Sequence, residues 1–230
     1  MKKAVLILIL AFTTLMQSQE MKQLPMINVT GEGKIKVIPD QALISISLET
    51  KGINAVDVKK ENDAKMDAVM KYIKKANIAK EDFETQRVSL NPNYDYEKKK
   101  NYYLATQSVQ ILLRDLSKYD VLIDGLVGLG INRIDNVEFK SSKFDVLQTD
   151  ARKLAIKNAK AKAEDFVSVL GQKVGKAYII SDNSQSYNPQ PISYAMKTMA
   201  MASDASEPRE TLATGELEIV VSVSVNFILE

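Results

Sequence analysis

Residues 216–229 have the sequence ELEIVVSVSVNFIL, in which every second position is apolar. This period of two predicts a β-strand that buries one face. The apolar face consists of Leu217, Ile219, Val221, Val223, Val225, Phe227 and Leu229. An apolar face of this length needs a covering layer, so the strand predicts a sheet with other elements packed on one side.

The same period predicts further strands upstream. Residues 27–37 place Gly31 and Gly33 at the apolar parity, which we interpret as a strand with a bend in its middle. A second strand follows at residues 42–48. Residues 83–94 and 102–113 flank a polar, lysine-rich segment at 95–101 and predict a hairpin. Shorter strands are predicted at residues 134–139 and 174–180.

Three stretches have the period of amphipathic helices. We expect Asn54 to cap a first helix that ends near Ala76, and Ser117 to cap a second one that Gly128 and Gly130 stop. The longest helix is expected at residues 144–170. Its inner side is predicted to consist of Ala151, Leu154, Ala155, Ala159, Ala163, Phe166 and Leu170, an alanine-rich stripe that allows close packing on a sheet.

The order of these elements lacks the regular strand–helix alternation of a doubly wound sheet. Hairpins combined with helices predict an α+β fold with largely antiparallel sheet and amphipathic helices packed on one face. The first elements hint at a duplicated strand-helix-strand-strand unit. Residues 181–211 show neither period, and an irregular loop of this length is typically functional or disordered.

The first residues have the order of a secretory signal peptide. Lys2 and Lys3 precede an apolar run at residues 4–16, and polar residues follow. We therefore expect residues 1–19 to be removed on export, leaving one domain at residues 20–230. Because the apolar run is shorter than the roughly 20 residues of a membrane-spanning helix, no transmembrane anchor is expected in the mature chain.

Composition removes several classes of catalytic site. The chain contains no histidine and no cysteine. Ser-His-Asp and Cys-His nucleophiles, thiol redox centres and histidine or thiolate metal sites are therefore excluded, and we expect no cofactor. Removing residues 1–19 takes away two of the 31 basic residues and none of the 29 acidic ones, so the mature chain is formally neutral. A neutral chain has no net electrostatic attraction to nucleic acid or to an anionic membrane.

Carboxylates remain as candidate catalytic groups. Glu32, Asp40, Glu49, Asp82 and Glu84 are numerous enough for an acid-base pair, although no spacing selects two of them. A carboxylate-based hydrolase acting on envelope material is therefore an alternative function. Gly31-Glu32-Gly33 lacks the third glycine and the following helix of a nucleotide fingerprint, and a strand is the better interpretation.

Two other groups of residues carry alternatives. Met196, Met199 and Met201 are weak candidates for Cu(I) binding or oxidant buffering, or for docking of a flexible loop on the domain or on another subunit. Tyrosines and lysines at residues 94–103 combine the aromatic and basic groups that bind single-stranded nucleic acid or glycan. Cross-strand packing with a charged turn is the simpler interpretation of that hairpin.

An ordered set of short motifs runs along most of the chain. The set opens with Val29-Thr30-Gly31-Glu32-Gly33 and Pro39-Asp40-x-Ala42. It continues with Asp82-x-x-Thr85, Leu90-x-Pro92-x-Tyr94, Val137-x-Phe139, Ala159-x-Ala161-Lys162-Ala163, Leu170-Gly171, Val174-Gly175 and Gly215-Glu216. This set resembles the SIMPL-domain family, whose bacterial members include exported oxidative-stress defence and periplasmic immunogenic proteins. The resemblance covers residues 27 to the end.

The resemblance implies an α+β fold, a periplasmic location, ring or channel-like homo-oligomers and a link to stress resistance. It supplies no catalytic residues. We therefore expect an exported, non-enzymatic protein that acts through oligomeric assembly and through a protein or envelope partner. Protection against oxidative or general stress is the expected cellular effect.

Overall fold

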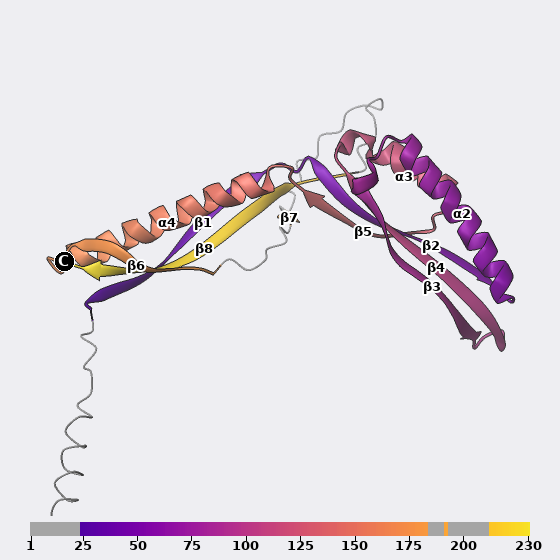
Figure 1. Cartoon of the computed structure of the whole chain (residues 1–230), viewed down its shortest axis with the longest axis horizontal. Coiled ribbons are helices and arrows are strands. Elements are labelled where there is room, and N and C mark those ends of the chain that lie inside the picture. The colour runs from indigo at the N-terminus through magenta and orange to yellow at the C-terminus, as the bar shows by residue number, and fades with distance from the viewer. Residues whose placement is uncertain (1–23, 184–190, 193–211) are drawn as a thin grey trace, which may run out of the picture.

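A computed structural model describes residues 24–183, 191–192 and 212–230. These residues form an elongated, bent molecule with two lobes (Figure 1). The terminal lobe contains β1 (Met26–Val37), α4 (Phe144–Ser168), β6 (Val174–Asp182), β7 (Pro191–Ile192) and β8 (Glu216–Leu229). The central lobe contains β2 (Gln41–Gly52), α2 (Ala55–Lys75), β3 (Phe83–Asp95), β4 (Lys100–Leu113), α3 (Tyr119–Gly128) and β5 (Arg133–Lys140). The predicted signal peptide lies outside the described residues.

The terminal lobe is a narrow antiparallel sheet with the order β1-β8-β6, and β7 also pairs with β8. The register between β1 and β8 runs without interruption from Met26 opposite Ile228 to Val37 opposite Leu217. Helix α4 packs on one face and buries the apolar side of β8. The alternation predicted for β1 and β8 is confirmed, and the glycines of β1 cause no shift of register.

The central lobe is an antiparallel sheet with the order β3-β4-β2-β5. Its core is formed by Ile44, Ile46 and Leu48 of β2, which are fully buried against α2 and α3. The predicted hairpin is β3 and β4. In both lobes the helices lie on the outer side of the bend and the open sheet faces lie on the inner side (Figure 1). The predicted α+β class, with antiparallel sheets and helices on one face, is confirmed; the duplicated unit stays a prediction.

The two predicted helix N-caps have different outcomes. Asn54 caps α2 as predicted, accepting from the backbone N–H groups of Val56 and Asp57. The prediction that Ser117 caps α3 is wrong. Residues 116–118 form a 3₁₀ turn, and Asp115 accepts from the Ser117 N–H instead. An aspartate two residues upstream competes for the same capping role, because a carboxylate is an equally good N-cap acceptor.

The inner side of α4 differs from the prediction at three positions. The buried residues are Ala151, Ala155, Ala159, Ala163 and Val167, spaced four apart. Leu154, Phe166 and Leu170 are exposed. Leu154 and Phe166 belong, with Asn158 and Lys162, to the neighbouring row of four-residue spacing, which lies beside the buried row on the helix surface. Leu170 lies beyond the end of α4 at Ser168.

Strand β6 is longer than predicted and extends to Asp182. The segment at 181–211 therefore begins in a strand, and it contains β7, which pairs with the start of β8. Residues 184–190 and 193–211 of that segment lie outside the described residues.

Candidate functional site

Helix α4 crosses β1 at Gly31 and Gly33. A Cβ atom added at Gly31 would lie 2.0 Å from the carbonyl oxygen of Ala155, and one at Gly33 would lie 1.9 Å from that of Ala151. Carbon and oxygen atoms do not approach so closely without a bond, so these positions require glycine. The glycines therefore admit a helix, and its backbone occupies the space that a phosphate at Gly31-Glu32-Gly33 would need.

Polar side chains of α4 reach the outer edge of β1. Lys162 Nζ donates to the backbone carbonyl of Thr30 at 3.0 Å, and the backbone N–H of Glu32 donates to Asn158 Oδ1 at 3.2 Å. These bonds satisfy outer backbone groups that would otherwise be available to another strand. The motifs around Gly31 and around Lys162, which lie far apart in the sequence, thus form one contact.

Asp40 joins the two chain segments that connect the lobes. Ser142 donates to the Asp40 carboxylate from its backbone N–H at 2.7 Å and from its Oγ at 2.5 Å. The N–H of Asp40 donates to the carbonyl of Lys140 at 3.1 Å. Burial acts to raise the pKa of Asp40, but the two bonds from Ser142 outweigh it, with help from the charge of Lys143, and the pKa lies below its ordinary value. These bonds tie the β1–β2 connection to the β5–α4 connection.

The remaining motif residues occupy structural positions. Ala42 lies opposite Phe139, so two motifs pair beside the bend. On the hairpin, Thr85 lies opposite Val109, Pro92 opposite Tyr103 and Tyr94 opposite Asn101. Gly171 and Gly215 have positive φ angles of 65° and 60°. Gly171 follows the end of α4 and Gly215 precedes β8, where a left-handed residue turns the chain.

The five candidate carboxylates are held by separate partners. Glu32 pairs with Lys34 at 3.1 Å, and Asp40 with Ser142. Glu49 pairs with Arg133, Asp82 with Arg114, and Glu84 accepts from Gln86. Asp82 is buried and bound by two guanidinium nitrogens at 2.6 and 2.7 Å, a bidentate pair that raises the pKa of Arg114. No hydrogen bond or shared cation joins any two of the five in the described part of the chain.

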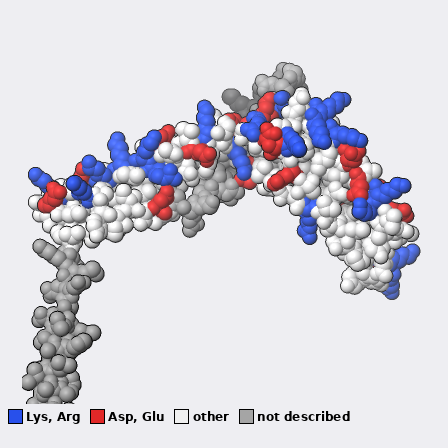
Figure 2. Space-filling model, viewed as in Figure 1, with Lys and Arg blue, Asp and Glu red and all other residues white. Residues whose placement is uncertain are grey.

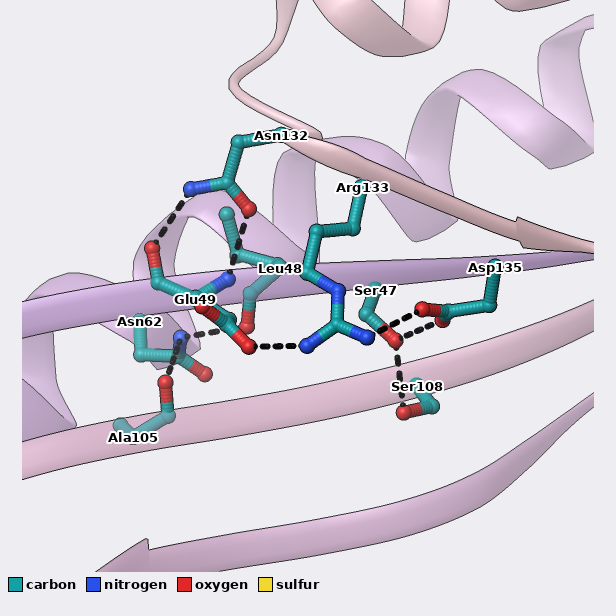
Figure 3. Close-up of polar contacts among 9 residues, drawn as sticks. All are labelled: Ser47, Leu48, Glu49, Asn62, Ala105, Ser108, Asn132, Arg133 and Asp135. Atoms are coloured by element: carbon teal, nitrogen blue, oxygen red, sulfur yellow. Dashed lines mark hydrogen bonds and ion pairs between the residues drawn. The ribbon is translucent and has the colours of Figure 1, made fainter.

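A polar network on the open face of the central lobe lies around Arg133, a residue that the sequence analysis did not single out (Figure 3). Its guanidinium lies 2.5 Å from Glu49 and 2.8 Å from Asp135. The hydrogen bond to Glu49 and the charge of Asp135 raise the pKa of Arg133. Asn132 accepts from the Glu49 N–H at 2.9 Å and donates to the Glu49 carbonyl at 2.8 Å. The network therefore fastens β5 to β2.

Two serines complete this network. Ser47 donates to Asp135, and its Oγ lies 2.8 Å from Ser108 Oγ (Figure 3). Ser47 is buried, so its hydroxyl is withdrawn from solvent. This arrangement stabilises the pairing of three strands, and it gives the hydroxyl little access to a substrate. Opposite charges two residues apart, as at Arg133 and Asp135, are the sequence signal that marks this face.

Asn62 is a buried polar residue within the apolar row of α2. Its Nδ2 donates to the carbonyl of Leu48 at 3.2 Å and lies 3.5 Å from the carbonyl of Ala105 (Figure 3). The same Nδ2 donates to Thr50 Oγ1 at 3.0 Å. These bonds tie α2 to both central strands. The sequence contains a signal for this burial, because Asn62 lies four residues from both Val58 and Met66 and therefore on the same face of the helix.

The hairpin end of the central lobe carries a pocket of about 540 Å³. Two loops line it: Lys51, Gly52 and Ile53 come from the end of β2 and the start of the β2–α2 loop, and Asp95, Lys98, Lys100, Asn101 and Tyr102 from the hairpin. Lys51 Nζ lies 5.9 Å from the centroid of the Tyr102 ring, and the rings of Tyr94 and Tyr96 meet edge to face at 5.1 Å. Tyrosines and lysines of residues 94–103 thus lie near one another, which is the arrangement that a combined aromatic and basic surface requires.

Met196, Met199 and Met201 lie outside the described residues. Within residues 24–183, 191–192 and 212–230, no group of three or more acidic residues is placed to hold a metal ion. In that part of the chain no helix combines the length and apolarity that crossing a membrane requires.

Comparison with known proteins agrees with the motif pattern. The SIMPL family model, described as a protein of unknown function (DUF541), matches residues 27–227. The uncharacterized protein YggE of Escherichia coli K12 is 29% identical over 200 residues, which cover 86% of this chain and 81% of YggE. The 26 kDa periplasmic immunogenic protein of Brucella melitensis is 31% identical over 221 residues, covering 92% and 87%. The chain belongs to the SIMPL family.

Proposed function

We propose that this chain is an exported periplasmic protein that acts without catalysis, through assembly of identical copies and contact with a protein or envelope partner. Its cellular effect is protection against oxidative or general stress. The periplasmic relative from Brucella melitensis supports the location. The separate engagement of the five carboxylates favours this function over the hydrolase alternative.

The observation that carries the assembly proposal is the apolar outer edge of β6. Tyr178, Ile179 and Ile180 are 57%, 47% and 56% exposed. Strand β6 pairs only with β8 among the described strands, so its outer backbone groups face away from the sheet. A long edge strand with exposed apolar side chains is uncommon in a monomer and is suited to a protein contact.

The opposite side of the same sheet offers a second apolar surface. Phe166 of α4 is exposed in the row that includes Asn158 and Lys162, whose side chains reach the edge of β1, and Leu170, two residues beyond the end of α4, is exposed as well. Two different apolar surfaces on opposite sides of one sheet favour head-to-tail contact between copies. Such a contact closes into a ring when the rotation between neighbours permits it.

Light scattering of the mature protein over a range of concentrations tests the proposal. We expect an oligomer for the wild type and a shift to monomers for Tyr178→Lys combined with Ile180→Lys. Val121→Lys on α3 is the matched control, because Val121 is at least as exposed but lies in the central lobe. A wild-type chain that stays monomeric at every concentration contradicts assembly. A deletion strain that carries the monomeric variant should survive oxidants less well than one that carries the wild type. Equal survival of the two strains contradicts a role of assembly in protection.

A further inference from the structure

Two neighbouring loops at the far end of the central lobe expose apolar side chains. Ile53 and Val56, at the β2–α2 connection, are 85% and 73% exposed, and Tyr96, in the hairpin turn, is 84% exposed. The loops lie side by side, because both line the same pocket. Figure 1 places them at the end of the molecule farthest from β6. We call residues 51–56 and 94–102 the loop tip.

Lysines surround these apolar groups. The loop tip contains four lysines, Lys51, Lys98, Lys99 and Lys100, but only two carboxylates, Asp95 and Glu97. Asp95 is already engaged, since it accepts from the backbone N–H groups of Glu97 and Lys98 at 3.1 and 3.0 Å and its Oδ2 lies 3.9 Å from Lys98 Nζ. Within the described residues, no carboxylate forms an ion pair with Lys51 or Lys100. Figure 2 shows mostly uncharged and basic surface at this end.

The local distribution changes what the total charge implies. The mature chain is formally neutral, which gave an anionic membrane no net support. However, electrostatic attraction to a surface falls off within about 8 Å at physiological salt, so only the charges near the contact matter. At the loop tip these charges are in basic excess.

The combination of residue types selects one kind of partner. Exposed aliphatic side chains enter the boundary between headgroups and acyl chains, tyrosines favour the headgroup level, and lysines attract anionic lipid. A nucleic acid or an acidic polysaccharide would use the lysines and tyrosines, but it would leave Ile53 and Val56 exposed to water. A lipid bilayer uses all three kinds of side chain.

We propose that the loop tip docks on the surface of a bilayer that contains anionic phospholipid. The loop tip and the β6 edge lie in different lobes, so docking does not depend on the proposed assembly. An oligomer would present several loop tips to one membrane and bind it more tightly than a single chain does.

Flotation of the mature protein with phosphatidylcholine vesicles, with and without phosphatidylglycerol, tests this. We expect binding only to vesicles with phosphatidylglycerol, and weaker binding at high salt. Each lysine near a bilayer contributes about fivefold to partitioning. Three such factors multiply to about 125-fold. We therefore expect Lys98→Gln, Lys99→Gln and Lys100→Gln together to reduce partitioning by at least about tenfold.

Matched controls separate the loop tip from general charge and apolarity. Lys71→Gln, Lys74→Gln and Lys75→Gln remove the same charge from the opposite end of α2 and should leave partitioning within about twofold of the wild type. Ile53→Ser with Tyr96→Ser should weaken binding, whereas Val121→Ser with Val127→Ser, exposed on α3, should not. Circular dichroism confirms that each variant is folded.

Three results would overturn the proposal. The first is an absence of binding to phosphatidylglycerol vesicles at low salt, and the second is an equal loss in the loop-tip and control variants. The third is lysine-dependent binding of soluble polygalacturonate without vesicle binding, which would assign the surface to an acidic polysaccharide. The double variant Tyr178→Lys with Ile180→Lys separates membrane docking from assembly. Its chains are expected to be monomeric, and they should still bind vesicles if docking is independent of assembly.

Discussion

Lys162 of α4 donates a hydrogen bond of 3.0 Å from Nζ to the backbone carbonyl of Thr30, at the outer edge of β1. The bond forms because Gly31 and Gly33 let α4 lie deep enough for a lysine stem to reach past the strand. Two motifs that are more than 120 residues apart are therefore parts of one helix–strand contact. The motif residues at this contact protect a strand edge and set the depth of the helix.

Replacing Lys162 by methionine should destabilise the terminal lobe modestly. Methionine keeps much of the apolar stem but loses the donor, so we expect a loss of about 0.5–1 kcal/mol in the free energy of unfolding, because the bond is charged but exposed. Urea denaturation measures it. Lys157→Met is the control, because Lys157 is exposed on the same helix. Equal stabilities of the two variants would show that the bond to Thr30 contributes nothing.

Gly33→Ala should have a larger effect. Its Cβ atom would lie 1.9 Å from the Ala151 carbonyl, so α4 must move away from β1 and open contacts along the buried alanines. We expect a loss of at least about 2 kcal/mol, typical of overpacking in a rigid core. Gly128→Ala, at the last residue of α3, adds a Cβ atom with no neighbour within 4 Å. Urea denaturation should show this control to be unchanged or slightly more stable, and comparable losses in both variants would contradict the packing argument.

The elements with a strict period were predictable from the sequence, whereas their partners were not. Alternation identified β1, β2 and β8, and the alanine stripe identified α4 as a close-packing helix. No local pattern indicates that Met26 lies opposite Ile228, because that pairing joins residues 202 positions apart. The glycines of β1 were interpreted as a bend for the same reason, since the helix that needs them lies more than 110 residues downstream.

The errors in side-chain placement have similarly specific causes. Phe166 and Leu170 were assigned to the inner side of α4 because large apolar side chains are usually the buried ones. The residues that are in fact buried follow a strict spacing of four that includes Ala163 and Val167. Asn62 was overlooked because a polar residue breaks the apolar pattern that identifies a helix face. The bond between Asp40 and Ser142 joins residues whose adjacency depends on the finished fold.

Asn62→Asp should destabilise the central lobe strongly. The substitution keeps the shape but replaces the Nδ2 donor by a carboxylate oxygen that faces the carbonyls of Leu48 and Ala105. Because an unpaired charge would be buried there, we expect a loss of about 3–5 kcal/mol near neutral pH. Asp63→Asn, at a neighbouring residue that is less buried, is the control. Thermal and urea denaturation give the two free energies, and a loss no greater than that of Asp63→Asn would contradict the assigned bonds.

The bond between Asp40 and Ser142 should make stability depend on pH in acid. The pKa of Asp40 is lowered in the folded protein, so the bound carboxylate contributes its full stabilisation above the ordinary aspartate pKa of about 3.9. The contribution is lost as the pH falls through the folded value, because between the two pKa values the unfolded chain binds more protons than the folded one, and below both values the two chains are equally protonated. The difference in unfolding free energy between the wild type and Asp40→Asn should therefore be constant from about pH 5 to 7 and shrink below about pH 4.

Urea denaturation of both proteins across this pH range measures the effect. Ser142→Ala provides the second variant, because it keeps the carboxylate and removes the Oγ donor at 2.5 Å. Its own difference from the wild type should shrink over the same acid range, since both variants report on one charged hydrogen-bonded pair. Asp40→Asn and Ser142→Ala combined should lose less stability than the sum of the single changes. A difference that is flat from neutral to acid pH, or strictly additive losses, would show that the junction between the lobes does not depend on this carboxylate.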